Sequence, residues 1–199
     1  AVLLETLSRG VQDAPTLREA ELLESGGMRA QEVGNARLPG FTAFLDGAQW
    51  TPVFWIENIP IAHGTVAVVI RQRRERRLTT WRAPIVKRAL YAPLSLLSAR
   101  SAEALAATGL EVVDTLAKRR PASGHPFELQ EIAYQSVLGA REMLEKELAE
   151  QWCDSTDAAL FVDGGIGASG KAAKSASVVG VVKSHQKLYA READLPIVL

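Results

Sequence analysis

Two short segments of this chain share one pattern, in which an apolar run ends in an aspartate that glycine follows at once. They are Phe44-Leu45-Asp46-Gly47 and Phe161-Val162-Asp163-Gly164. Apolar runs of this kind are typical of buried strands, and a carboxylate at the end of one is costly to remove from water unless a positive charge lies beside it. A glycine after it lets the backbone turn and leaves room for a ligand. The pattern therefore predicts two buried strands whose ends carry a binding site.

A long helix is expected between these strands, over residues 127–152, with Pro126 at its start. At about 100° per residue, Glu145 lies on one shoulder of the apolar stripe, Glu147 lies on the other, and Glu142 points nearly outward. Arg141 shares the shoulder of Glu145, at a spacing that also suits a simple ion pair on a helix surface. Periodicity therefore leaves Glu145 and Glu147 equal as candidates for chemistry.

The order of elements predicts an α/β fold, a mixed sheet flanked by helices. Residues 1–40 are expected to form a helical lead-in, with helices over 2–9 and 15–25, and residues 41–199 the main domain. Leu195–Leu199 looks like the start of another strand, so we expect the domain to continue beyond it. A second helix is expected over residues 101–118. The main strands are expected at residues 41–46, 53–56, 61–70, 78–86, 158–162 and 178–183.

Composition excludes several classes of protein. The single Cys153 excludes a disulfide framework and a cysteine-based zinc site, and it suits a protein of the reducing cytoplasm. No apolar run is long enough to cross a bilayer, so no membrane partner is expected. The hydrophobic fraction of 47% is ordinary for a globular domain.

The formal net charge is zero, but the charges are unevenly distributed. Residues 71–88 include eight basic side chains and a single acid, Glu75, and residues 171–191 include five basic side chains and no acid. The long helix is rich in glutamate. Basic margins around an acidic centre are typical of a metal site flanked by phosphate contacts. A solvated hairpin tip would explain the first basic cluster equally well.

Two aspartates and a helical glutamate are hard oxygen ligands, which suit Mn²⁺ or Mg²⁺ rather than zinc. If the first and third strands run parallel, and the strand at 158–162 joins beside the first, Asp46 and Asp163 come out together at one edge of the sheet. Metal ions there would activate a water and stabilise the leaving oxygen in phosphodiester cleavage. Lys183, at the end of the last strand, is the candidate to hold a phosphate or the attacking water. Its plain alternative is a solvated lysine.

The glycine-rich segment Gly165–Lys171 has the spacing of a phosphate-binding loop. The Walker form needs serine or threonine where Ala172 stands, and there is little room for a helix before the next strand. We therefore expect a loop beside Asp163, and a nucleotide-binding protein is the less favoured alternative.

With these residues in view, the chain resembles the NurA nuclease family from about Phe41 onward. The resemblance rests on four motifs in order: Leu45-Asp46-Gly47-Ala48-Gln49, Arg141-x-x-x-Glu145, Phe161-Val162-Asp163-Gly164 and Gly180-Val181-Val182-Lys183. The family usually has serine where Ala48 stands, and Asp-Gly-x-Leu where the second aspartate begins a run of glycines.

The resemblance implies an RNase H-like fold and Mn²⁺-dependent cleavage of single-stranded DNA and duplex ends. It also implies a homodimer that docks on a HerA-type hexameric ATPase in DNA end processing or phage defence. It favours Glu145 over Glu147 and Glu142 as the metal ligand beside Asp46 and Asp163. The main alternative is a non-catalytic subunit that docks on such a motor and guides DNA.

Overall fold

The computed structural model describes residues 16–18, 27–29, 42–117, 119–181 and 187–198. The chain divides into two compact units, residues 39–181 and residues 1–38 together with 182–199. None of the described helices is both long and apolar enough to cross a membrane.

In the smaller unit, strand β1 (Thr16–Arg18) pairs in parallel with β10 (Lys187–Tyr189). The 3-10 turn η2 (Glu192–Asp194) leads into helix α4 (Leu195–Val198). Two expectations are therefore wrong at these residues, the helix at 16–18 and the strand at 195–198. Three residues are too few for a period to show, and pairing with a distant segment decides the conformation of β1.

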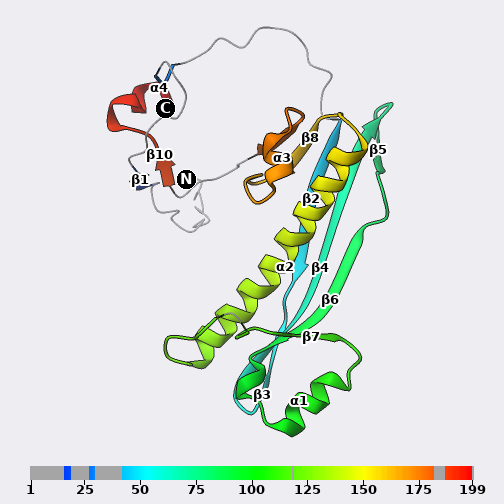
Figure 1. Ribbon diagram of the computed structural model, residues 1–199, viewed down its shortest axis with the longest axis vertical. Helices are drawn as coiled ribbons and strands as arrows, with labels where there is room; N and C mark the ends of the chain where they lie inside the picture. The colour runs from blue at the N-terminus through cyan, green and yellow to red at the C-terminus, as the bar shows by residue number, and fades with distance from the viewer. Residues whose placement is uncertain (1–15, 19–26, 30–41, 118, 182–186, 199) are drawn as a thin grey trace, which may run out of the picture. The chain divides into compact units, whose positions relative to one another are not determined.

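The larger unit holds the main sheet and three α-helices (Figure 1). Its strands are β2 (Ala43–Trp50), β3 (Val53–Ile56), β4 (Ile59–Arg74), β5 (Arg77–Thr80), β6 (Ile85–Ala92), β7 (Glu111–Asp114), β8 (Leu160–Asp163) and β9 (Val178–Val181). Its helices are η1 (Leu94–Leu96), α1 (Ala99–Ala106), α2 (Pro126–Ser155) and α3 (Gly170–Lys174).

The strand order across the sheet is β7-β6-β4-β2-β8-β9, with β3 and β5 paired to β4. Strands β2, β4 and β6 are antiparallel neighbours, so β2 and β6 run in the same direction. Strand β8 joins beside β2 in parallel, and β9 joins β8 in parallel. The expected α/β class is confirmed, and β8 meets the condition set for the aspartates, since it joins β2 in parallel. The single strand expected over 78–86 is wrong, because β5 ends at Thr80 and β6 begins at Ile85. Pro84, which cannot donate a ladder hydrogen bond, lies in the break.

Helix α2 lies along one face of this sheet (Figure 1). Along β4 the residues Val66, Val68 and Ile70 are buried while their neighbours are only half-buried, as strand alternation requires. Leu148 and Trp152 of α2 pack in one cluster with Val68 and Ile70. Burial of such side chains stabilises the fold by roughly 1.5–3 kcal/mol each.

The start of α2 is defined by its sequence. Pro126 occupies the first turn, where its missing N–H costs nothing. The Nδ1 atom of His125 caps the helix by accepting a hydrogen bond from the Phe127 N–H at 3.3 Å. Near the other end, the Trp152 indole N–H donates to the Ala158 carbonyl at 2.9 Å, which ties the helix to the chain entering β8.

The helix expected over 101–118 is wrong in its second half. Helix α1 ends at Ala106, and Glu111–Asp114 form β7 beside β6. Gly109 has φ +74°, a left-handed conformation that ends a helix readily. The β-branched Val112 and Val113 then pair with β6, so tertiary pairing overrides the apparent helical stripe.

The carboxylate of Glu128 organises the loop before α2. It accepts hydrogen bonds from the backbone N–H groups of Ala122, Ser123 and Gly124 and from the Ser123 hydroxyl. These donors lower the pKa of Glu128 to about 2.

We expect Glu128→Gln to lower the melting temperature at pH 7. The folded pKa lies below the ordinary value of 4.5, so the stabilisation is present above pH 4.5 and is lost as pH falls through about 2.

Thermal unfolding from pH 2 to 8 measures this effect. The difference between wild type and Glu128→Gln should shrink toward low pH, whereas Glu103→Gln, an exposed change on α1, should show no such trend. A difference that stays constant across this range would contradict the assignment.

Candidate active site

Asp46 and Asp163 lie on neighbouring parallel strands. The register pairs Leu45 of β2 with Val162 of β8, so the next position along both strands brings Asp46 beside Asp163. Leu45 and Val162 are buried, and side chains alternate along a strand, so both aspartates project from the other face of the sheet. Both are exposed. The register thus brings together the two residues that the sequence singled out.

The expected end of the first strand at Asp46 is wrong. Strand β2 continues to Trp50, because residues 46–50 pair with residues 65–69 of the long strand β4. Strand β8, in contrast, ends at Asp163. Asp46 therefore lies within a strand, at the level where its parallel neighbour stops.

Glu145 of α2 reaches the sheet at Gly47. A Cβ atom added at Gly47 would lie 2.0 Å from Oε1 of Glu145 and 3.0 Å from Cγ1 of Val68. Only a residue without a side chain leaves room there for the carboxylate. The Glu145 side chain is 19% exposed, and its Oε1 lies 3.4 Å from Nε of Arg141 one turn earlier on the helix.

The surroundings of Glu145 disfavour its charge. Burial is the main cause that raises the pKa of Glu145, and the negative charges of Glu142, Asp46 and Asp163 add to it. The guanidinium of Arg141 opposes the rise without cancelling it. The three carboxylates therefore share one electrostatic environment with an excess of negative charge, although they approach it from two faces of the sheet.

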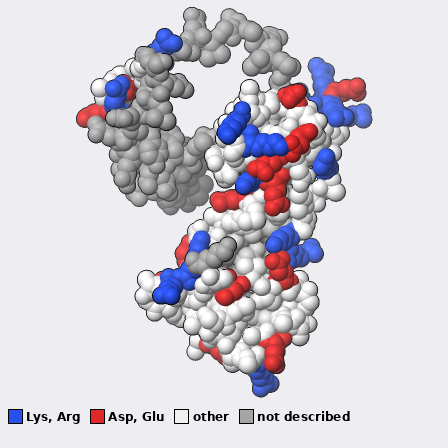
Figure 2. Space-filling view, viewed as in Figure 1, with Lys and Arg blue, Asp and Glu red and all other residues white. Residues whose placement is uncertain are grey.

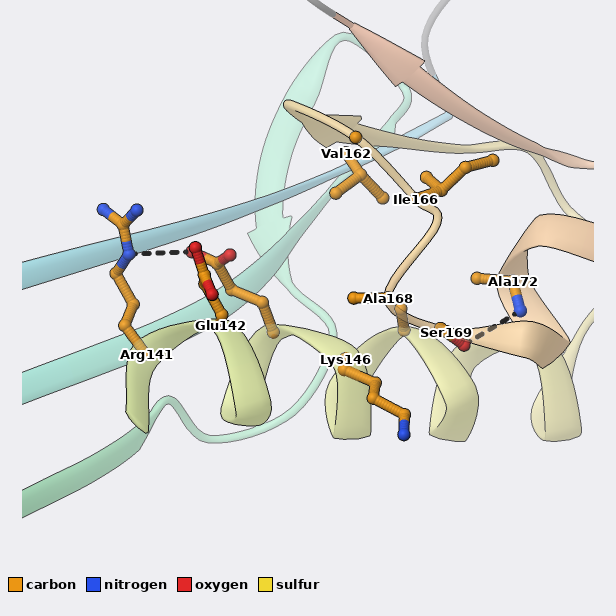
Figure 3. A pocket seen from close by; sticks show the side chains of 11 residues that line it. Arg141, Glu142, Lys146, Val162, Ile166, Ala168, Ser169 and Ala172 are labelled. Atoms are coloured by element: carbon orange, nitrogen blue, oxygen red, sulfur yellow. Dashed lines mark hydrogen bonds and ion pairs between the residues drawn. The ribbon is translucent and has the colours of Figure 1, made fainter. Parts of the chain in front are cut away.

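A pocket of about 230 Å³ separates α2 from the loop after β8. Arg141, Glu142 and the Arg141–Glu145 ion pair lie at one end of it, and Ser169 lies at the other, while Lys146 points away from the sheet (Figure 3). Glu142 lines the same pocket but is exposed. Of the three candidate glutamates, Glu145 is the one that packs over β2.

Glu147 is exposed on α2 and is not among the residues that line this pocket. The Arg141 side chain is 29% exposed and, among the described residues, pairs only with Glu145. It therefore offers a positive charge beside the carboxylates.

The residue types fit a hard divalent cation, since all three side chains donate oxygen. The raised pKa of Glu145 also fits, because a cation beside it would offset the burial and the repulsion from the aspartates. Within the described residues, however, no three histidine, cysteine, aspartate or glutamate side chains are arranged so that they could hold a metal ion. Strand alternation explains this, since the aspartates leave the sheet on the face away from α2.

The glycine-rich segment after β8 is partly helical. Gly164 has φ +101°, and α3 follows at Gly170–Lys174, capped by Ser169, which also donates to Oε1 of Glu150 at 2.9 Å. Lys171 forms an ion pair with Asp154 of α2. A phosphate-binding loop needs its lysine directed at the ligand and a longer helix behind it, so these features weigh against nucleotide binding.

Lys183 and His185 lie outside the described residues. The other two histidines have structural surroundings: His63 lies 6.2 Å from the Trp50 ring, edge to face, and His125 caps α2.

Two glycines have a role that the sequence analysis missed. Gly47 makes room for Glu145, and Gly180 allows close approach of the loop, since a Cβ there would lie 2.6 Å from the Gly164 carbonyl oxygen. A glycine inside a strand pattern often marks such an approach, and this signal was present in both segments.

Comparison with known proteins gives no assignment. No protein-family model matches the chain, and no curated protein matches it.

Proposed function

We propose that this protein is a divalent-metal-dependent DNA nuclease with an RNase H-like fold. The observation that carries the proposal is the contact of Glu145 with β2 at Gly47, one residue from Asp46 and beside the end of β8. The pattern of strand with aspartate, helix with glutamate and adjacent strand with aspartate supports the same function. From the NurA resemblance we further propose a homodimer that works with a HerA-type hexameric ATPase.

Asp46 and Asp163 on one face of the sheet, and Glu145 reaching Gly47 from the other, are the residues that would hold Mn²⁺ or Mg²⁺. To share one ion the three carboxylates would have to converge beyond the end of β8, because the structure does not bring them together. Bound there, the metal supplies a water nucleophile at neutral pH and neutralises charge on the leaving oxygen. The chain's own contribution is to position the ligands: Gly47 admits the Glu145 carboxylate, and the β2–β8 register sets the aspartates side by side. We propose that Arg141, which pairs with Glu145, holds a substrate phosphate.

Removing either aspartate tests the proposal. We expect Asp46→Asn and Asp163→Asn each to reduce Mn²⁺-dependent cleavage of end-labelled DNA by about 100-fold or more, because a lost ligand removes transition-state stabilisation. Asp46 is exposed within β2, so Asp46→Asn should change the free energy of unfolding by less than about 0.5 kcal/mol. The control is Asp157→Asn, an exposed aspartate in the turn before β8. Wild-type cleavage by either site variant would exclude the assignment.

The lack of a ready ligand set among the described residues favours one second candidate, a non-catalytic subunit that guides DNA. Mn²⁺ titration separates the two. A cation that binds only the folded chain raises its stability, by about 2.7 kcal/mol at 100 times the dissociation constant. We expect Mn²⁺ to raise the melting temperature of wild type but not of Asp46→Asn. If Mn²⁺ neither raises the melting temperature of wild type nor supports cleavage, and the protein still binds DNA, the guiding role would be established.

A further inference from the structure

The tip of the β4–β5 hairpin concentrates positive charge. Arg73, Arg74, Arg76 and Arg77 are all exposed, and Glu75 is the single acid among them. Figure 2 shows the resulting blue cluster at the end of the hairpin, around one red residue. Among the described residues, no hydrogen bond or ion pair joins any of these four guanidinium groups to another side chain.

The local structure of this tip is unfavourable by itself. Arg74 and Arg77 lie directly opposite each other on the two strands, and like charges in that position repel. The two residues that close the turn, Glu75 and Arg76, have φ values of 49° and 66°, in the left-handed region that side chains other than glycine seldom adopt. Among the described residues, no side-chain hydrogen bond or ion pair offsets the repulsion between Arg74 and Arg77.

The base of the hairpin, in contrast, is fixed. Arg71 donates to the Thr80 hydroxyl at 2.7 Å and to the Leu78 carbonyl at 3.1 Å. Arg82 lies over the Trp81 ring at 4.2 Å and donates to Gln151 of α2 at 3.1 Å. The basic residues at the base therefore bind other groups of the protein. Those at the tip are exposed to solvent at the end of a hairpin that these contacts hold in place. Trp81, covered by Arg82, is not placed to stack on a base.

The register relates the tip to the candidate site. Val69 of β4 lies opposite Asp46, and Arg73 follows four residues later, on the same face of the strand by alternation. Arg74 and its partner Arg77 project from the other face, so the guanidinium groups surround the end of the hairpin. At a rise of about 3.4 Å per residue, Arg73 lies about 14 Å along the strand direction from Asp46, and the turn at Glu75 and Arg76 lies about 20 Å from it. In duplex DNA, where successive nucleotides rise by about 3.4 Å, these distances correspond to roughly four to six nucleotides.

We propose that residues 73–77 bind the phosphate backbone of DNA, roughly four to six nucleotides from the phosphate that would be cleaved at Asp46 and Asp163. This inference rests on the proposed function for the identity of the polyanion as DNA. Phosphate between Arg74 and Arg77 turns their repulsion into two charge-assisted contacts, because each guanidinium donates to a different oxygen. The repulsion between Arg74 and Arg77 in the unbound tip is therefore relieved in the complex.

The test is DNA binding in EDTA, where no metal-dependent cleavage occurs. Fluorescence anisotropy with a labelled duplex at several salt concentrations compares wild type with Arg74→Gln/Arg77→Gln. The matched control, Arg119→Gln/Arg120→Gln, removes the same charges from an exposed loop. We expect only the hairpin variant to bind more weakly, with the slope of log K against log salt reduced by about 1.8, from two lost phosphate contacts. Its melting temperature should not fall.

The outcomes separate this inference from the proposed function. If the hairpin variant binds DNA like wild type, or if both double variants weaken binding equally, the hairpin assignment is overturned, whatever the aspartate variants show. If the hairpin variant alone loses binding while Mn²⁺ supports no cleavage, the nuclease proposal fails and the phosphate contact stands. If the wild type is active, DNA substrates that extend fewer than about four nucleotides from the cleavage site toward the hairpin should be cleaved equally by wild type and the hairpin variant.

Discussion

Replacing Glu145 by glutamine is expected to abolish Mn²⁺-dependent cleavage and, at the same time, to stabilise the fold at neutral pH. Cleavage should fall by about 100-fold or more, because glutamine keeps the shape of the side chain but loses the charge that would bind the cation. The pKa of Glu145 is raised above its ordinary value of 4.5, mainly by burial, so the ionised carboxylate destabilises the folded state. Glutamine removes that destabilisation.

The pH dependence follows from the same shift. The folded chain holds the Glu145 proton more tightly than the unfolded chain does, so wild-type stability decreases as pH rises from 4.5 through the folded pKa. The melting-temperature advantage of Glu145→Gln should therefore grow over that interval and vanish below it. The control is Glu147→Gln, an exposed change two residues along α2 on its opposite shoulder, which should alter neither quantity. An active Glu145→Gln, or an inactive Glu147→Gln, would move the site to the other shoulder of α2.

Gly47→Ala is expected to remove activity by displacing Glu145 from the sheet. The new Cβ would lie 2.0 Å from Oε1 of Glu145, so the carboxylate has to leave its position. The flexible end of a glutamate moves easily, so the unfolding free energy should fall by only about 1 kcal/mol, at the low end for added core volume. Cleavage should fall as far as in Glu145→Gln. The double variant should be no worse, because both changes remove the same group.

Gly64→Ala is the matched comparison, at another glycine under α2. Its Cβ would lie 2.6 Å from the Tyr91 ring and 2.8 Å from Val137, both buried. These neighbours cannot move aside, so we expect about 3 kcal/mol of destabilisation with normal cleavage below the melting temperature. Thermal unfolding and cleavage assays on both variants measure the contrast. An active Gly47→Ala would show that Glu145 need not reach the sheet for catalysis.

The regular patterns of the sequence were sufficient for much of the fold. The apolar, β-branched run at 61–70 predicted a strand, and Pro126 with the apolar stripe after it predicted α2. Each of these signals is local, because it depends on the period of one element. The same local reasoning failed at 111–114, where Val112 and Val113 fit a helical stripe but pair with β6.

The sequence also identified the two aspartates as candidate site residues, because each follows an apolar run and precedes a glycine. It could not establish that they are neighbours, because that depends on which strand joins β2. The parallel register between residues 43–45 and 160–162 decides it. That pairing joins segments more than a hundred residues apart, and no local period carries such information.

The choice between Glu145 and Glu147 is the clearest example of a question that the sequence alone does not decide. Periodicity determined that Glu145 and Glu147 flank the apolar stripe on opposite sides, and could not distinguish them, since a stripe has two equivalent shoulders. Only the way α2 lies across β2 separates them: one shoulder meets Gly47, where a missing side chain leaves space for the Glu145 carboxylate, and the other leaves Glu147 exposed. The sequence thus determined the strands, the helix and the candidate acids, and the packing of α2 on the sheet decided which acid lies at the site, because that choice depends on contacts between distant segments.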